Sequence, residues 1–273
     1  MSLKSTRKIL SVIFIFIIAA GGCLFAGTST LRGTLCSESY MQKHFTSDKV
    51  LEQCQKNFDS RIEALSEKSG IPVRAFEAVN NFDEIKSDSP VRRLFGGHDT
   101  TLYTKDTVDR FEQLCTEYLD GNSIKYDKAL VHNTANEAAE IYADCFGLKN
   151  TEGLTSFVDS FYNSFEKLLS ISFLMIIIPI VLLFLIYKKV YDIFQIVFSA
   201  FTAEGIALIF IGAAGLLFKW GTADIYPQIY AQAAGNVVKG IFVIIMLLGA
   251  VLTACFIAGN VAICKKQNKN NGY

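Results

Sequence analysis

Four long apolar runs divide this chain of 273 residues and constrain its fold more than any other feature of the sequence. They cover residues 9–27, 168–187, 195–218 and 238–262. A helix needs about 20 consecutive apolar residues to cross the hydrocarbon core of a bilayer. Each run has about that length, so the sequence predicts an all-α, polytopic membrane protein with four transmembrane helices.

The cations beside these runs predict how the chain is threaded through a cell membrane. Lys and Arg residues lie before the first run, after the second and after the fourth. Short cytoplasmic segments of membrane proteins are enriched in such cations. Both termini are therefore expected in the cytoplasm, and the long segment between the first and second runs is expected outside it. The cytoplasmic segments are residues 1–8, 188–194 and 263–273, and the extracytoplasmic segment is residues 28–167.

The first run has two interpretations. A basic start followed by an apolar run also describes a cleavable signal peptide. The apolar run continues through Leu24, Phe25 and Ala26, beyond the small residues that resemble a cleavage site. This continuation favours a retained signal anchor, whereas cleavage would leave three spans.

Residues 28–167 are long enough for a domain of their own, and their apolar residues recur at helical spacing. Leu51, Cys54, Phe58 and Ile62 form one such stripe, which predicts a helix from about residue 47 to 69. Further stripes predict helices over about 104–119 and 126–146, and a last stripe runs without a break into the second apolar run. The sequence therefore predicts a helical extracytoplasmic domain inserted between the first and second spans.

Four cysteines fall in this segment and are candidates for disulfide bonds, because thiols outside the cytoplasm are commonly oxidised. They are Cys36, Cys54, Cys115 and Cys145. A helical hairpin would separate Cys115 from Cys145 by roughly 20 Å along its axis, too far for a disulfide. Two sets of pairings remain: Cys54–Cys115 with Cys36–Cys145, or Cys36–Cys115 with Cys54–Cys145. The alternative is four small buried thiols.

Glu204 lies near the middle of the third run, with apolar neighbours on both sides. An ionisable side chain at that depth costs at least about 2.5 kcal/mol, so it usually faces a protein interior or a water-filled path. Glu204 is therefore expected either to make a structural hydrogen bond or to handle a proton or cation.

Small residues recur in the third and fourth runs, where they let two helix backbones approach closely. The predicted packing residues are Gly205, Gly212, Gly215, Ala250, Ala254 and Ala258. Contact between these two spans of one chain is the favoured interpretation, and a seam between copies of the chain is the alternative. The segment 219–237 is expected to lie along the outer membrane interface, anchored by Trp220, Tyr226 and Tyr230.

Charge and motifs limit the function. The outer segment holds 16 Lys and Arg against 23 Asp and Glu, which argues against nucleic-acid binding. No nucleophile elbow, phosphate loop or Cys-x-x-Cys motif occurs, so neither an enzyme nor a cofactor or metal site is predicted. The absence of Asn-x-Ser/Thr acceptors favours a bacterial protein.

The expected function is a non-enzymatic membrane protein whose outer domain binds a partner or ligand, as a sensor or an accessory subunit of a membrane complex. The alternatives are a small oligomeric channel or transporter that uses Glu204, and a membrane immunity protein against a toxin. The expected partners are membrane lipid and either another protein or further copies of the chain.

Overall fold

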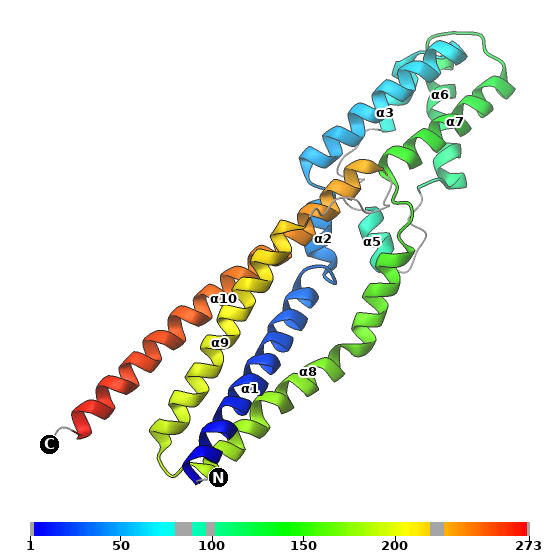
Figure 1. Ribbon diagram of the computed structural model, residues 1–273. Helices are drawn as coiled ribbons and strands as arrows, with labels where there is room; N and C mark the ends of the chain where they lie inside the picture. The colour runs from blue at the N-terminus through cyan, green and yellow to red at the C-terminus, as the bar shows by residue number, and fades with distance from the viewer. Residues whose placement is uncertain (1–2, 80–88, 97–101, 219–226, 272–273) are drawn as a thin grey trace. The chain divides into compact units, whose positions relative to one another are not determined.

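A computed structural model describes residues 3–79, 89–96, 102–218 and 227–271, and all regular elements in these ranges are helices (Figure 1). Four of these helices are long and apolar enough to cross a membrane. The predicted all-helical class and the four apolar helices are therefore confirmed, and they are compatible with a multi-pass membrane protein. The chain divides into two compact units, each described separately below.

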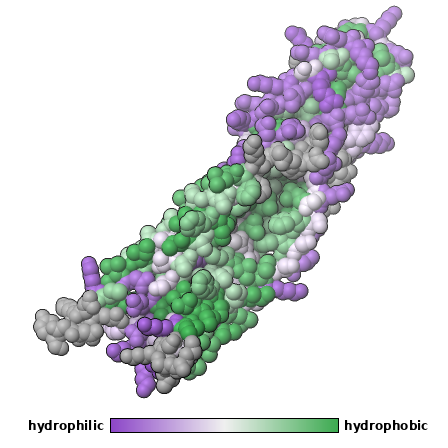
Figure 2. Space-filling model, viewed as in Figure 1, coloured by the Kyte–Doolittle hydropathy of each residue, from purple (hydrophilic) through white to green (hydrophobic). Residues whose placement is uncertain are grey.

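Unit 1 contains the apolar helices and comprises Met1–Cys36, Val158–Lys219 and Val238–Tyr273. Apolar residues cover much of the surface of these helices (Figure 2). The four helices extend beyond the apolar runs that predicted them: α1 (Leu3–Gly33), α8 (Glu152–Ile186), α9 (Val190–Leu217) and α10 (Gln228–Asn271).

Helix α1 lies between α8 and α9 (Figure 1). One core cluster joins the three helices through Phe14 and Ile18 of α1, Leu183 of α8, and Ile193 and Ala200 of α9. Contact between α1 and its neighbours therefore depends on interdigitating aliphatic and aromatic side chains, with no ion pair in the cluster.

Glycines bring α9 and α10 into close contact. A Cβ atom added at Gly205 would lie 2.7 Å from the carbonyl oxygen of Gly249, and one at Gly212 would lie 2.6 Å from Cβ of Met246. At Gly215, an added Cβ would lie 2.1 Å from the ring of Phe242. The absence of these side chains is what allows the two helices to pack backbone against backbone.

The alanines of α10 do not take part in this contact, contrary to the favoured expectation. Ala250, Ala254 and Ala258 are exposed, whereas Gly249 is buried against α9. A step of one residue turns a helix by about 100°. Because Gly249 allows a closer approach than alanine does, the face that contains Gly249 meets α9 and the alanine face points away from it.

Unit 2 comprises Ser37–Phe157 and Trp220–Val237, and its surface is mostly hydrophilic (Figure 2). Its helices are α2 (Glu38–Phe45), α3 (Asp48–Ser69), the 3₁₀ helix η1 (Val73–Val79), α5 (Pro90–Phe95), α6 (Lys105–Gly121) and α7 (Lys128–Phe146). The start of α8 and the first turns of α10 also belong to the unit.

The ends of the longer helices in unit 2 lie close to the predicted positions, since local capping residues define them. Gly70 ends α3 in the left-handed conformation, with φ of 74°, which glycine adopts without steric cost. Thr104 caps α6 by accepting a hydrogen bond from the backbone N–H of Thr107, and Asp127 caps α7 in the same way. Helix α2 was not predicted because its eight residues are too few for a clear apolar stripe.

An aromatic cluster forms the core of unit 2. The ring of Phe58 on α3 lies 5.8 Å from that of Phe146 and 6.0 Å from that of Tyr142, both on α7. Phe111 of α6 lies 6.0 Å from Tyr142 as well. These tilted and edge-on contacts are the favoured geometries for aromatic rings, so they fix the relative positions of α3, α6 and α7.

Candidate functional site

A cleft of about 160 Å³ opens on unit 2 between the start of α3 and the first turns of α10. Its lining comes from three helices and the α2–α3 turn: His44, Ser47, Lys49, Val50, Gln53, Ile229, Gln232, Ala233 and Asn236. The floor is apolar, because Val50, Ile229 and Ala233 are buried. The rim carries amide, hydroxyl, imidazole and ammonium groups.

The charge of this lining favours a particular kind of occupant. Lys49 contributes a positive charge, and no carboxylate is among the residues that line the cleft. The amides of Gln53, Gln232 and Asn236 can donate hydrogen bonds from opposite walls. The cleft is therefore suited to a polar group, and to a negatively charged one above all.

Tyr230 holds the α10 wall of the cleft in place. Its side chain is 1% exposed, and its hydroxyl donates a hydrogen bond of 3.0 Å to the carbonyl oxygen of Phe146. Its ring stacks on Phe45 of α2, with 5.8 Å between the ring centroids. Because Ile229, Tyr230 and Ala233 face inward, Gln232 is left at the surface and can line the cleft.

This position of Tyr230 corrects two expectations about the segment 219–237. The segment is helical from Gln228 onward rather than a loop throughout, and Tyr230 belongs to the core of unit 2 rather than to a membrane interface. Tyr230, Ala233 and Val237 follow one another at helical spacing, which indicated a helix in this segment. The pattern was missed because the segment between the third and fourth apolar runs is short. Trp220 and Tyr226 lie outside the described residues.

All seven cysteines are free thiols in the structure, so none of the predicted disulfides is formed in it. The four candidates Cys36, Cys54, Cys115 and Cys145 are buried. Burial raises the pKa of Cys54 and of Cys115 to about 12, and that of Cys36 to about 11. Thiols in this state are poor nucleophiles, since the thiolate is the reactive form.

Glu204 lies in unit 1, where α9 contacts α1, and it is 4% exposed. Gly22 of α1 makes room for it: an added Cβ at Gly22 would lie 2.0 Å from Oε2 of Glu204. Among the described residues, no hydrogen-bond donor reaches that oxygen. A buried carboxyl oxygen without a donor is costly and uncommon, which makes Glu204 a second candidate site.

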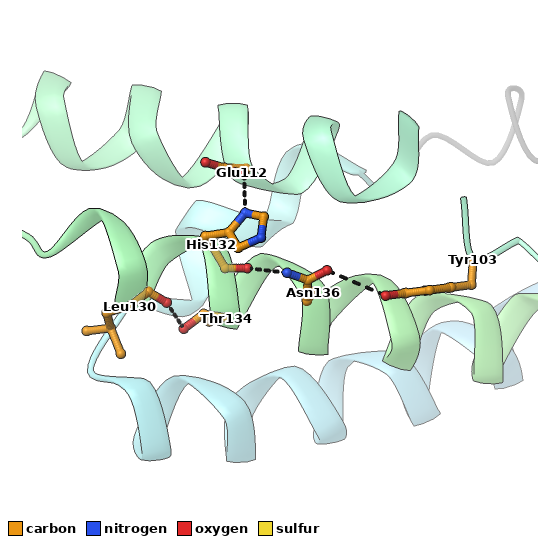
Figure 3. A network of polar contacts seen from close by, with 6 residues as sticks. All are labelled: Tyr103, Glu112, Leu130, His132, Thr134 and Asn136. Atoms are coloured by element: carbon orange, nitrogen blue, oxygen red, sulfur yellow. Dashed lines mark hydrogen bonds and ion pairs between the residues drawn. The ribbon is translucent and has the colours of Figure 1, made fainter. Parts of the chain in front are cut away.

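A third polar group joins α6 to α7 (Figure 3). Nδ1 of His132 lies 2.7 Å from Oε2 of Glu112, and the amide of Asn136 donates to the carbonyl oxygen of His132. The hydroxyl of Tyr103 is 3.5 Å from Oδ1 of Asn136. The side chains of His132 and Glu112 are exposed, and no group of three metal-ligating residues occurs in the described part of the chain. The network therefore fastens two helices together and has no evident chemical role.

Comparison of the chain with protein-family models, with curated protein sequences and with solved structures found no match.

Proposed function

We propose that this chain is a non-enzymatic integral membrane protein whose unit 2 lies outside the cytoplasm and binds a polar, negatively charged ligand or partner side chain in the cleft. It would act as a sensor or as an accessory subunit of a membrane complex. The observation that carries this proposal is the continuity of α10. One wall of the cleft belongs to this helix, which runs unbroken from Gln228 to Asn271 and includes a candidate membrane span.

An occupant of the cleft would contact α10 directly through Gln232 and Asn236. It would also contact the start of α3 through Ser47 and Lys49, so its binding affects how tightly the first turns of α10 are held against α3. A ligand shifts a conformational equilibrium only by its difference in affinity for the two states. An occupant that contacts both walls binds more tightly when the first turns of α10 are packed against α3 than when they are not. Because α10 is one continuous helix, a change at its first turns is conveyed to its candidate membrane span.

The charges beside the spans support the orientation. Eight Lys and Arg residues precede the first apolar run or follow the second and the fourth, and all eight fall on one side of the membrane when unit 2 is placed on the other. The apolar side chains exposed on α8, α9 and α10 would then contact lipid.

Filling the cleft is expected to abolish binding. Gln232→Trp places an indole between the α3 and α10 walls, whereas Gln228→Trp makes the same change one turn earlier on α10, at an exposed position outside the cleft. We expect native mass spectra of the protein, extracted in mild detergent from its own host, to show a bound species with the parent chain and with Gln228→Trp. In the Gln232→Trp variant, the fraction of protein that carries the bound species should fall by at least nine tenths. Retention of the same species by Gln232→Trp would contradict binding in the cleft.

A second candidate function is proton or cation handling at Glu204, which the unsatisfied and buried carboxyl oxygen favours. Under this hypothesis Glu204→Gln, which keeps the shape of the side chain but cannot ionise, abolishes ion flux into liposomes that contain the purified protein. Glu166→Gln is the matched control, since Glu166 is exposed on α8. Equal flux through both variants and the parent chain would exclude this function.

A further inference from the structure

Six cations lie at one end of unit 1, although they come from three distant parts of the chain. Figure 1 shows that the start of α1, the turn between α8 and α9, and the end of α10 all lie at this end of the unit. The six side chains are exposed. We call them the basic end patch, and they are Arg7, Lys8, Lys188, Lys189, Lys265 and Lys266.

Two side-chain contacts bring the three segments together. The hydroxyl of Tyr187, in the α8–α9 turn, lies 3.3 Å from the carbonyl oxygen of Arg7 on α1. Because Lys188 directly follows Tyr187, one tyrosine side chain connects the backbones that carry Arg7 and Lys188. The ammonium group of Lys266 lies 5.9 Å from the centre of the Tyr191 ring, so the end of α10 is held against the first turn of α9.

The packed segments hold like charges together with little compensation. Asp192 is the only acid among residues 1–8, 188–194 and 263–273. In the described part of the chain, none of the six cations of the basic end patch takes part in an ion pair. Like charges repel one another, and an anion that lies among them replaces this repulsion with attraction. The patch is therefore suited to a negatively charged group.

Exposed apolar side chains border the basic end patch. Val12 lies one turn after Lys8 on α1 and is 52% exposed, and Leu185 lies four residues before Lys189 and is 78% exposed. An occupant with a negatively charged head and an apolar tail can contact both kinds of surface, whereas a free inorganic anion uses the cations alone. An anionic phospholipid has this combination of groups.

We propose that the basic end patch binds the phosphate of an anionic phospholipid, whose acyl chains lie along the exposed apolar side chains of α1 and α8. Basic pockets between transmembrane helices recognise lipid head groups in this way. The bound phosphate links the start of α1 to the α8–α9 turn. The inference requires that unit 1 crosses a membrane, and it is independent of the cleft in unit 2.

Lipid binding by the purified full-length chain tests this inference. Native mass spectra are recorded in mild detergent with added phosphatidylglycerol, which is anionic, or phosphatidylcholine, which has no net charge. We expect adducts with phosphatidylglycerol and few with phosphatidylcholine. Each Lys or Arg near an anionic lipid surface strengthens binding by roughly fivefold, so the double variant Arg7→Gln, Lys188→Gln should bind phosphatidylglycerol roughly 25-fold more weakly. Equal adduct formation with the two lipids would overturn the inference.

The double variant Lys125→Gln, Lys128→Gln is the matched control, because it removes two exposed cations from unit 2. It should bind phosphatidylglycerol as the parent chain does. An equal loss of binding in the two double variants would show that binding follows net charge alone, which also contradicts the proposed site. The four cations that remain in the Arg7→Gln, Lys188→Gln variant maintain the charge bias that orients the spans.

Competition with inorganic phosphate distinguishes a lipid from a free anion as the occupant. An equal concentration of inorganic phosphate should leave the phosphatidylglycerol adducts in place, because the acyl chains contribute contacts that phosphate lacks. Displacement of the lipid under these conditions would assign the basic end patch to a free anion and refute the proposed lipid site.

Discussion

Tyr230→Ala is expected to destabilise unit 2 by about 3–5 kcal/mol, as large-to-small changes of buried aromatic residues do. The substitution removes a ring that is stacked on Phe45 and leaves a cavity between α2, α7 and α10. It also removes the donor that satisfies the carbonyl oxygen of Phe146. Because Tyr230 anchors the first turns of α10, we expect these turns to detach from the rest of unit 2 before the unit unfolds.

Hydrogen exchange of residues 228–237, together with thermal unfolding in detergent, measures this effect. The amides of this segment should exchange far faster in Tyr230→Ala than in the parent chain. Tyr230→Phe keeps the ring and loses only the hydrogen bond, so it should cost about 1 kcal/mol. Tyr103→Phe is the matched control, because its hydroxyl is exposed and its bond to Asn136 is long (Figure 3). Unchanged exchange in Tyr230→Ala would show that other contacts hold α10.

Gly205→Val is expected to separate α9 from α10 and to destabilise unit 1 by about 3 kcal/mol, at the upper end of the usual cost of overpacking. The first added carbon would lie 2.4 Å from Oγ1 of Thr253, 2.7 Å from the carbonyl oxygen of Gly249 and 2.8 Å from the backbone nitrogen of Thr253. Two of these atoms belong to the backbone and cannot rotate away. The helices must therefore move apart, which removes their contacts over several turns.

Gly27→Val provides the comparison, because an added Cβ at Gly27 of α1 meets no atom within 4 Å. Thermal unfolding in detergent and resistance to proteolysis should fall sharply for Gly205→Val and stay close to the parent chain for Gly27→Val. Gly249→Val should behave like Gly205→Val, since its Cβ would lie 2.6 Å from the carbonyl oxygen of Gly205. Equal stability of Gly205→Val and Gly27→Val would refute the close contact of α9 with α10.

Much of the fold could be predicted because it depends on local properties. The four apolar helices follow from run length, and the ends of α3 and α7 follow from Gly70 and Asp127, whose effects reach only a few residues. The last apolar stripe of the outer segment, which runs without a break into the second apolar run, predicted one continuous helix, and α8 is one helix from Glu152 to Ile186. The burial of Glu204 was also predictable, since an ionisable group inside an apolar run avoids hydrocarbon.

The candidate sites depended on contacts between distant parts of the chain. Gly249 and Ala250 are neighbours in α10 and lie about 100° apart around the helix axis. The apolar composition of the run does not determine which of the two faces α9. Gly22 makes room for Glu204 only because α1 crosses α9 at that level. Tyr230 looked like an interfacial residue because its partners Phe45 and Phe146 lie far away in the sequence.

The sequence by itself determined that this chain is helical and has four helices apolar enough to cross a membrane, because hydrophobic length and periodicity act within each segment. Only the tertiary structure decided that the first turns of α10 belong to unit 2 and form one wall of a polar cleft. The physical reason is that burial of a side chain such as Tyr230 is a property of the helices packed around it, and no local pattern specifies those neighbours.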